Sequence, residues 1–347
     1  MDFTPSEEQA AAQGLAARIF GDLSTHERLV AAGTGTDAGL WKELCTAGLP
    51  GAVEDIGLLG LVLLLEEQGR ATAQVPLAVT CVYGILAVAE HGTAEQRERL
   101  LPGLRDGTAV ATGAFPARGG VKAVEGALYG VVPWVPWLRD ATQVLVADAE
   151  REVWIVEAGA PGVTVVPVET TAPWSAGRLV LDGVRGEFLG TGSGACAAVL
   201  AASRTAFAGL QAGVCAGSLA RAVQHTSTRE QFGRPLSTNQ GVLLRAADAH
   251  MDTEAIRVTA YEAAWRRDQQ LDYAAQALTA AWWASEAGRR VVHAGQHLHG
   301  GTGADLDHPV HRHFLWGRQL DAYLGCGAEL LEELGRLIGS GRTEGTS

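Results

Sequence analysis

Over the first third of the chain, stretches rich in Glu, Gln, Ala and Leu are typical of helices. Turn residues such as those at 48–51 separate these stretches. Thr93 followed by Gln96 is typical of a capped helix start, and we expect that helix to end near Pro102. The pattern predicts an α-helical N-terminal domain over residues 1–105.

From Asp106 to about Gly190 the pattern changes to short β-branched and apolar runs between turns. Such runs are typical of strands. The expected strands are 127–132, 143–147, 153–157, 163–168 and 178–181. The pattern predicts a small middle β domain, a barrel or a sandwich, over residues 106–190.

After a glycine-rich stretch the chain becomes Ala-rich with a long helical period, to about Gly339. Gly209, Gly213 and Gly217 are four residues apart, so they share one helix face and predict a close helix contact. A C-terminal four-helix domain is expected over 191–339, with a frayed tail at 340–347. The expected helices are 195–227, 239–268, 272–299 and 309–336.

Composition narrows the class of protein. The chain has 347 residues, 47% apolar, with 27 basic and 39 acidic side chains for a net charge of −12. This is typical of a globular chain of two or three domains.

The sequence also argues against several functions and locations. The lack of clustered Lys and Arg argues against nucleic-acid binding. Leu58 to Leu65, the longest apolar run, is far shorter than the roughly 20 residues of a membrane span. The acidic start lacks signal-peptide features, so we expect a cytoplasmic protein.

Several catalytic-looking patterns lack the context that their chemistry needs. Gly213 to Gly217 spells a nucleophile elbow with Cys in place of Ser, but the segment is predicted to be helical. Gly33 to Gly39 follows no strand, which favours an interhelix loop over a phosphate loop. His293 and His297 have helical metal-ligand spacing without an obvious third ligand, so no metal is expected. The five cysteines, an odd number, are expected to pack in the core.

The segment 225–240 has the strongest chemical pattern. Arg229 ends a helix, and Gly233 and Pro235 turn the chain. A guanidinium and the Phe232 ring would therefore project from one corner beside backbone donors, which suits a pyrophosphate next to a planar ring. The alternative is a capped interhelix turn in which Phe232 is a packing plug.

A second segment, 297–312, holds three glycines and several histidines. Its glycines would expose backbone N–H groups in a loop after a helix, a geometry usable for a phosphate or a ribose.

Together the two segments resemble the acyl-CoA dehydrogenase family, in their motifs and in the order of the three domains. The opening Asp2-Phe3 and Glu7-Glu8-Gln9 extend the resemblance over nearly the whole chain. It implies an FAD whose adenosine and pyrophosphate are held here while its isoalloxazine lies in a neighbouring subunit. His297 stands where the family usually has Gln. The implied cofactor residues are Arg229, Phe232, Leu236, Gln240, His297, Gly300, Gly301, Thr302 and Gly303.

The resemblance also implies a carboxylate base for the α-proton of an acyl thioester, and no carboxylate occupies its usual positions. The register places Gly327 at one position and Ser203 at the alternative one. Glu329 and Asp321 lie near the first position and are the fallback candidates.

The flavin-ring segments of the middle domain also depart from the family pattern. The usual loop is replaced by Gly113 to Gly120, and the segment Pro133 to Trp137 lacks the usual hydroxyl. Such a loss is expected of a partner subunit in a heteromeric enzyme. The segments 203–207 and 299–312 resemble the non-catalytic subunits of actinobacterial α2β2 enzymes that desaturate steroid side-chain CoA thioesters. The predicted function is a subunit that completes the FAD site of a partner bearing a Glu base.

Two alternatives remain open at this stage. The chain could be a homo-oligomeric member of the family recruited to a non-redox or biosynthetic tailoring role on an acyl thioester. It could also be a complete homomeric dehydrogenase that uses Glu329 or Asp321 as its base. The resemblance implies an oligomer, and the glycine-rich helix faces and the split cofactor site also favour assembly.

Overall fold

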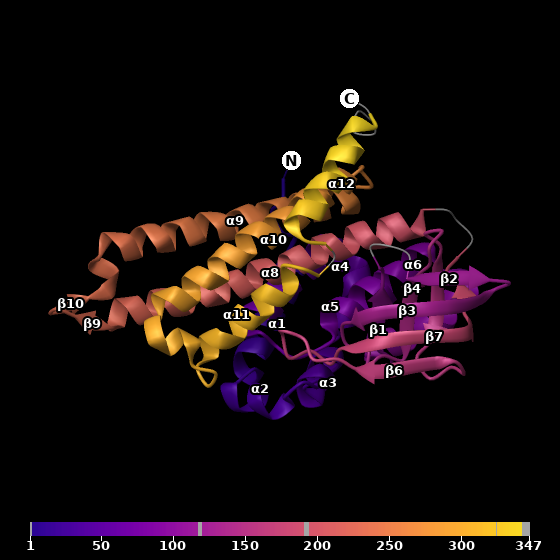
Figure 1. Ribbon diagram of the computed structural model, residues 1–347, viewed down its shortest axis with the longest axis horizontal. Helices are drawn as coiled ribbons and strands as arrows, with labels where there is room; N and C mark the ends of the chain where they lie inside the picture. The colour runs from indigo at the N-terminus through magenta and orange to yellow at the C-terminus, as the bar shows by residue number, and fades with distance from the viewer. Residues whose placement is uncertain (1, 117–119, 191–193, 324, 342–347) are drawn as a thin grey trace. The chain divides into compact units, whose positions relative to one another are not determined.

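The computed structural model describes residues 2–116, 120–190, 194–323 and 325–341. They form two compact units. Unit 1 consists of residues 2–26 and 58–73 and the described residues from 204 onward; unit 2 consists of the rest (Figure 1). Helices precede and follow a middle region of sheets along the chain, which confirms the predicted fold class. The three sequence domains stay a prediction.

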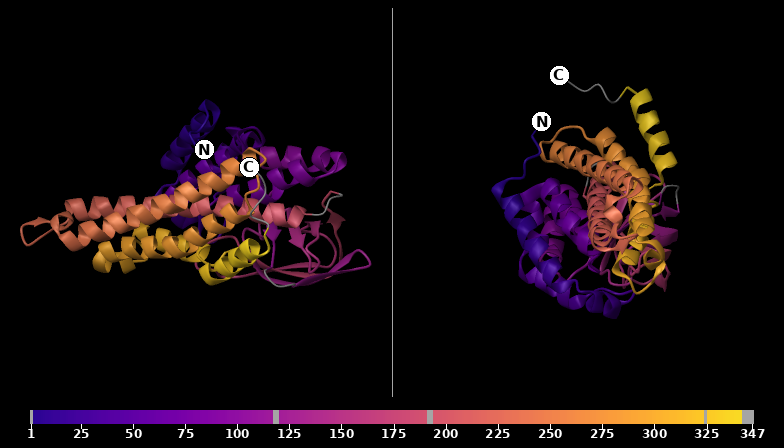
Figure 2. Two further views of the ribbon diagram at one scale, coloured as in Figure 1. Left: turned by 90° about the horizontal axis from the view of Figure 1, so that it is seen from above. Right: turned by 90° about the vertical axis from the view of Figure 1, so that its left-hand side faces the viewer.

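Unit 1 is almost entirely helical, and its long helices run side by side (Figure 2). Its elements are α1 (Glu7–Leu23), α4 (Leu49–Ala71) from Leu58, α8 (Ala195–Thr228) from Arg204, β9 (Glu230–Gln231), β10 (Arg234–Pro235), the 3-10 helix η2 (Leu236–Thr238), α9 (Gln240–Asp268), α10 (Ala274–Leu298), the 3-10 helix η3 (Gly300–Ala304), α11 (Pro309–Leu320) and α12 (Gly327–Gly339).

The predicted glycine face of α8 is a close contact with α4. A Cβ on Gly209 would lie 2.8 Å from Cγ1 of Val62, and one on Gly217 would lie 2.5 Å from the Arg70 carbonyl oxygen. A Cβ on Gly213 would overlap the Glu66 carbonyl oxygen. Each glycine thus meets a residue of α4 that is also spaced by four, which confirms the prediction.

Unit 2 begins with short helices. They are α2 (His26–Ala32), α3 (Ala38–Thr46), α4 as far as Gly57, α5 (Leu77–Val79), the π-helix η1 (Thr80–Leu86), α6 (Ala87–His91) and α7 (Ala94–Asp106). Thr93 and Gln96 form the predicted capping box of α7, which continues past the expected end to Asp106. Gly57 has φ 71° and ψ −169°, and this non-helical residue interrupts α4.

Two four-stranded sheets complete unit 2, in the orders β1-β4-β5-β8 and β2-β3-β7-β6. A single apolar core draws on both sheets, from Ala114 and Val144 of the first to Leu128 and Leu179 of the second, so the sheets bury one face against each other. The strands are β1 (Ala111–Ala114), β2 (Val121–Val124), β3 (Ala127–Val135), β4 (Gln143–Ala147), β5 (Val153–Glu157), β6 (Val163–Pro167), β7 (Gly177–Arg185) and β8 (Glu187–Phe188).

The five expected strands are present, and the sequence pattern missed β1, β2 and β8. The helix expected over 309–336 is wrong, because the chain breaks between α11 and α12. Gly325 lies in that break with φ 119°, a conformation that no right-handed helix contains.

The weaker sequence motifs have structural roles. Cys215 lies inside α8 and is fully buried, which rules out a nucleophile elbow. Residues 33–37 join α2 to α3 with Asp37 as the N-cap of α3, and Gly39 lies in the first turn of that helix. Among the described residues, no group of three potential ligands could hold a metal ion.

By length and hydropathy α8 could cross a membrane, and α3 with α4 would be a second candidate only as one bent pair. In α8, 72% of the apolar 18-residue stretch is buried inside the protein, which is typical of a core helix.

Candidate functional site

The segment after α8 forms a tight hairpin that carries Phe232 at its tip. β9 and β10 pair Gln231 with Arg234, and the two residues between them, Phe232 and Gly233, have φ values of 54° and 76°. Positive φ at both central positions is typical of a type I′ turn, but it is unfavourable for an aromatic residue.

The Phe232 side chain is 100% exposed. The alternative reading of Phe232 as a packing plug therefore fails within this chain. Arg229 and Gln240 are also exposed, and Leu236 is half-buried. The predicted cofactor residues of this segment thus lie on the surface, where another molecule can cover them.

The glycine loop forms η3, directly after α10. Gly300 has φ 62°, and a Cβ there or on Gly301 would meet nothing within 4 Å. Gly303 is buried beneath them, and its carbonyl accepts a hydrogen bond from the Gln296 side chain at 3.1 Å. The loop is therefore anchored at Gly303 and open at its first two glycines.

Thr302 and His297, two further predicted cofactor residues of this segment, differ in whether their side chains are free to contact a ligand. The hydroxyl of Thr302 donates to the His299 carbonyl at 2.8 Å, so it supports the loop itself. His297 is exposed on the last turn of α10.

Three neighbouring histidine rings bring the two predicted segments together at one end of unit 1. The ring of His299 lies 4.8 Å from that of His225 on α8 and 5.0 Å from that of His308, the N-cap of α11. Nδ1 of His299 lies 2.7 Å from the Gly295 carbonyl oxygen. Burial lowers the pKa of both His299 and His308, and neighbouring positive charges lower them further.

Sequence reasoning missed Arg221 and the role of His308. Arg221, His225 and Arg229 recur every four residues, so they share the face of α8 that leads to the hairpin. Burial lowers the pKa of Arg221, and its charge contributes to the lowered pKa values of His299 and His308. This end of unit 1 is thus rich in nitrogen donors, and the i, i+4, i+8 spacing was the signal available in the sequence.

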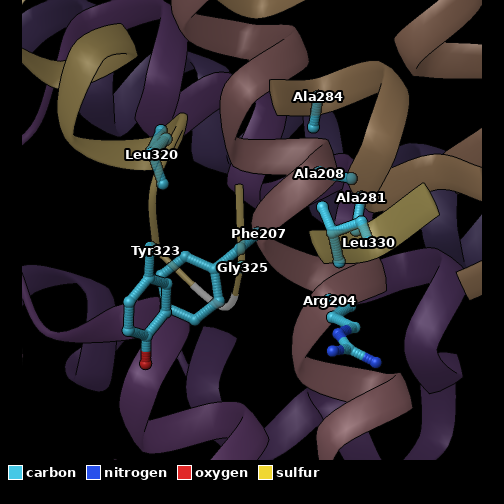
Figure 3. Close-up of a pocket in the computed structure, with 9 residues that line it drawn as sticks. All are labelled: Arg204, Phe207, Ala208, Ala281, Ala284, Leu320, Tyr323, Gly325 and Leu330. Carbon is cyan, nitrogen blue, oxygen red and sulfur yellow. The ribbon is translucent and has the colours of Figure 1, made fainter. Parts of the chain in front are cut away.

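A small pocket lies between α8, α10 and the chain around α12, and Figure 3 shows Phe207 and Tyr323 close together at one side of it. The two rings are 4.5 Å apart, edge to face. Arg204 lies at the other side of the pocket, and its guanidinium binds the Glu333 carboxylate at 2.8 and 2.6 Å. The cavity volume is about 20 Å³, which is room for about one water and too little for an acyl chain.

The predicted flavin-ring segments of unit 2 are directed into its own packing. A Cβ on Gly113 would lie 2.6 Å from Cζ of Tyr83, whose ring stacks on Phe115 with centroids 5.4 Å apart. The Thr112 hydroxyl donates to a backbone carbonyl, and the buried Trp137 ring stacks on a second tryptophan. Residues 117–119 of the expected loop lie outside the described residues.

Comparison with known proteins places the chain. Models of the acyl-CoA dehydrogenase N-terminal and C-terminal domains match residues 6–108 and 190–338. The acyl-CoA dehydrogenase FadE27 of Mycobacterium tuberculosis is 33% identical over 97% of this chain and 98% of its own length. The chain belongs to the acyl-CoA dehydrogenase family. Members of this family are FAD-dependent oxidoreductases.

Solved acyl-CoA dehydrogenase structures superpose over almost the whole chain. A variant of the Tcur3481-Tcur3483 steroid ACAD has a TM-score of 0.93 at 41% identity, covering 97% of this chain and 99% of that chain. The ChsE4-ChsE5 complex from Mycobacterium tuberculosis has a TM-score of 0.91 at 31% identity and full coverage of both chains. Butyryl-CoA dehydrogenase from Megasphaera elsdenii, 23% identical with a TM-score of 0.87, shares the fold and covers 97% of this chain and 100% of that chain.

The two positions predicted for the acyl-CoA dehydrogenase base offer no carboxylate of their own. Gly327 is buried at the start of α12, where a Cβ would lie 2.9 Å from Cγ of Glu286. The Glu286 side chain would have to shift to admit a side chain there. Ser203 is buried, and its Oγ donates to the Val199 carbonyl at 2.6 Å.

The fallback carboxylates have local structural partners. Asp321 lies 2.9 Å from the Arg318 guanidinium, and its carboxylate also accepts a hydrogen bond from Ser285 at 3.2 Å. Glu329 accepts the backbone N–H of Cys326 at 3.2 Å as part of a capping box. Glu286, which sequence reasoning missed because nothing local marks it, is paired with Arg289 at 2.8 Å. The residues predicted to hold the cofactor tail are thus mostly exposed. The carboxylates predicted as fallback bases are held by other partners.

Proposed function

We propose that this chain is a subunit of a heteromeric, FAD-dependent acyl-CoA dehydrogenase that desaturates an acyl-CoA with a bulky acyl group such as a steroid side chain. It contributes the adenosine and pyrophosphate half of an FAD site, and a homologous partner subunit contributes the carboxylate base. The observation that carries this proposal is the full exposure of Phe232 at a hairpin position where its φ of 54° is unfavourable. Such strain is kept where function requires it.

The residues of this end of unit 1 fit the cofactor tail. The Arg229 guanidinium can bind phosphate oxygens through two N–H groups, and the exposed Phe232 ring can stack on a planar base. Gly300 and Gly301 allow a close backbone approach, because a Cβ on either would meet nothing within 4 Å.

The flavin ring fits this chain less well. The Thr112 hydroxyl and the rings of Tyr83 and Trp137 are engaged inside unit 2. When bound, FAD supplies the acceptor for the hydride of the substrate β-carbon. This chain would hold the tail and orient it, while the partner's residues surround the ring and remove the α-proton.

The similar proteins support a heteromer. One solved relative is a complex of two differently named chains, ChsE4 and ChsE5, and another pairs Tcur3481 with Tcur3483 as a steroid ACAD. The carboxylates that a self-sufficient enzyme would use, Asp321 and Glu329, are engaged by neighbouring groups, which argues against that alternative. The inward packing of the flavin-ring segments favours the non-redox homo-oligomer as the second candidate.

An absorption spectrum tests the proposal. The chain is purified alone and after co-expression with a homologous acyl-CoA dehydrogenase subunit that has a Glu base. We expect a colourless chain alone and a yellow complex with about one flavin per heterodimer. Flavin at full occupancy in the lone chain would contradict the shared site, and no flavin in either preparation would favour the non-redox role.

Two variants of the same hairpin sharpen this test. Arg229→Met removes the expected phosphate ligand and should lower flavin occupancy of the complex at least about tenfold. Arg234→Met is the matched control, because Arg234 is also exposed but binds Asn239 at 3.2 Å. Equal flavin occupancy in both variants would contradict the role of Arg229.

A further inference from the structure

The buried histidine His299 lies at the junction of the two predicted cofactor segments. It directly precedes Gly300 of the glycine loop, and its ring stacks on that of His225, which lies one turn before Arg229. The two ring planes are inclined by 25°, and His299 is only 5% exposed. His299 therefore joins the hairpin segment to the glycine loop from a position that is shielded from water.

Hydrogen bonds determine which nitrogen carries the proton in His299 and in its neighbour His308. Nδ1 of His299 lies 2.7 Å from the Gly295 carbonyl oxygen. That oxygen can only accept, so Nδ1 carries the hydrogen and Nε2 is the nitrogen that can take up a proton. In His308 the roles are reversed, because its Nδ1 accepts the Val310 backbone N–H at 3.2 Å and caps α11. A second proton would leave the hydrogen bond of His299 intact, whereas it would break the cap made by His308.

The surroundings of the His299 ring keep it neutral in the unliganded chain. Burial is the largest effect that lowers the pKa of His299, and positive charge on Arg221, His225 and His308 lowers it further. The hydrogen bond to the Gly295 carbonyl acts in the opposite direction. Most titratable groups on the surrounding elements are basic; they are His26, Arg221, His225, Arg229, His297, Asp305, Asp307, His308, His311 and Arg312.

An anion bound at this junction would reverse the preference of His299. The pyrophosphate of FAD is negatively charged, and its expected ligands Arg229 and Gly300 lie in the two segments that the histidine pair joins. A negative charge beside an imidazole favours the imidazolium. The pyrophosphate is esterified at both ends, so it does not itself titrate near neutral pH. A proton taken up on binding would therefore belong to the protein.

We propose that binding of the adenosine and pyrophosphate half of FAD is linked to uptake of a proton at Nε2 of His299. The inference rests on the proposed function and adds the residue through which pH regulates that site. A group whose pKa is higher with the ligand than without it strengthens binding as the pH falls, until the unliganded chain is protonated as well. The chain should therefore hold the cofactor more tightly as the pH falls from about 7.5 to about 6.

Isothermal titration calorimetry of the full chain with ADP-ribose tests this link. ADP-ribose contains the adenosine and pyrophosphate of FAD, and its pyrophosphate is likewise esterified at both ends. Titrations at about pH 6.5 in two phosphate-free buffers of different protonation enthalpy give the protons taken up per ligand. We expect uptake of about 0.3–0.7 proton, and binding about three- to tenfold tighter at about pH 6 than at about pH 7.5.

His299→Gln separates the titration of the ring from its packing. The Gln amide can donate to the Gly295 carbonyl as Nδ1 does, but it does not titrate. This variant should take up no proton, and its affinity should no longer increase as the pH falls. His250→Gln is the matched control, because the His250 side chain on α9 is 66% exposed. It should keep the wild-type uptake and affinity. Circular dichroism confirms that both variants are folded.

The wild-type chain alone decides the question where a variant fails to fold. Binding of ADP-ribose without proton uptake overturns the link. Loss of uptake in His225→Gln or His297→Gln, with uptake retained in His299→Gln, assigns the proton to another ring and overturns the inference. If the lone chain does not bind ADP-ribose, the same calorimetry with FAD and the flavin-depleted complex decides, and FAD binding without proton uptake overturns the link.

Two outcomes separate this inference from the proposed function. A yellow complex with the homologue that binds FAD without proton uptake overturns the link and leaves the proposed function standing. Proton-linked binding of ADP-ribose by a chain that forms no complex with the homologue leaves the link standing and overturns the heteromer.

Discussion

Replacing Gly217 by alanine tests the packing of α8 against α4. Gly217 is buried opposite Arg70, whose carbonyl lies 3.0 Å from Nε2 of His313. An added Cβ would lie 2.5 Å from that carbonyl oxygen and 2.5 Å from the same ring nitrogen. The new methyl group would therefore enter the hydrogen bond between the Arg70 carbonyl and the buried His313 ring.

The size of the effect follows from these distances. An ordinary contact begins at 3.4 Å, so the Arg70 carbonyl and the His313 ring must each move by about 0.9 Å. Overpacking of this kind costs about 1–3 kcal/mol, and loss of a buried hydrogen bond costs a similar amount. Alanine regains about 1 kcal/mol of helix propensity. We expect a net loss of about 1–5 kcal/mol in the free energy of unfolding.

Urea unfolding followed by far-ultraviolet circular dichroism measures this loss. The control is Gly14→Ala in the interior of α1, where a Cβ would meet nothing within 4 Å. That variant should gain up to about 1 kcal/mol from propensity alone. A Gly217→Ala protein as stable as wild type would refute the close contact between the two helices.

Three further predictions follow from buried or exposed groups. Burial lowers the pKa of His313 to about 4, so only the unfolded chain takes up its proton between about pH 4 and 6.5. The free energy of unfolding should therefore rise with pH across that window, by roughly 3 kcal/mol from this residue, and His313→Gln should reduce the slope of urea stability against pH. Asp268→Ala should lower stability by about 2 kcal/mol in the same assay, because Asp268 accepts two backbone N–H groups at 2.8 Å where α4 resumes after its break. Of the five thiols, only Cys326 is exposed, so a thiol reagent at neutral pH should show one fast-reacting group that Cys326→Ser removes.

Each of these has an outcome that contradicts it. A stability curve that stays flat from pH 4 to 6.5 would mean that His313 is not held neutral. Asp22→Ala, at an exposed position on α1, is the control for Asp268→Ala, and equal losses in the two would contradict the capping role. Two or more fast thiols would contradict the burial of the other cysteines.

The sequence alone predicted those helices and strands that depend on interactions between residues close together in the chain. The capping box of Thr93 and Gln96 starts α7 because its hydrogen bonds join residues three apart. The strands over 143–147 and 153–157 have the expected bounds. The glycine spacing of α8 also predicted a close helix contact, because residues four apart lie on one face of a helix whichever element packs against it.

Other features depended on contacts between distant parts of the chain. β1 was missed because Ala111–Ala114 has no β-branched alternation, and it is a strand through its parallel pairing with β4. The break at Gly325 was missed because the helical pattern continues through it. A helix or strand at such places is decided by packing that local propensity does not encode.

The candidate site shows the same division. The sequence by itself marked the hairpin and the glycine loop, because an Arg-Phe-Gly pattern and a run of glycines are local signals. Only the tertiary structure placed the rings of His225 and His308 beside that of His299, and Glu286 against Gly327. These residues lie on different elements far apart in the chain, and their meeting depends on how the helices of unit 1 pack, which no local spacing contains.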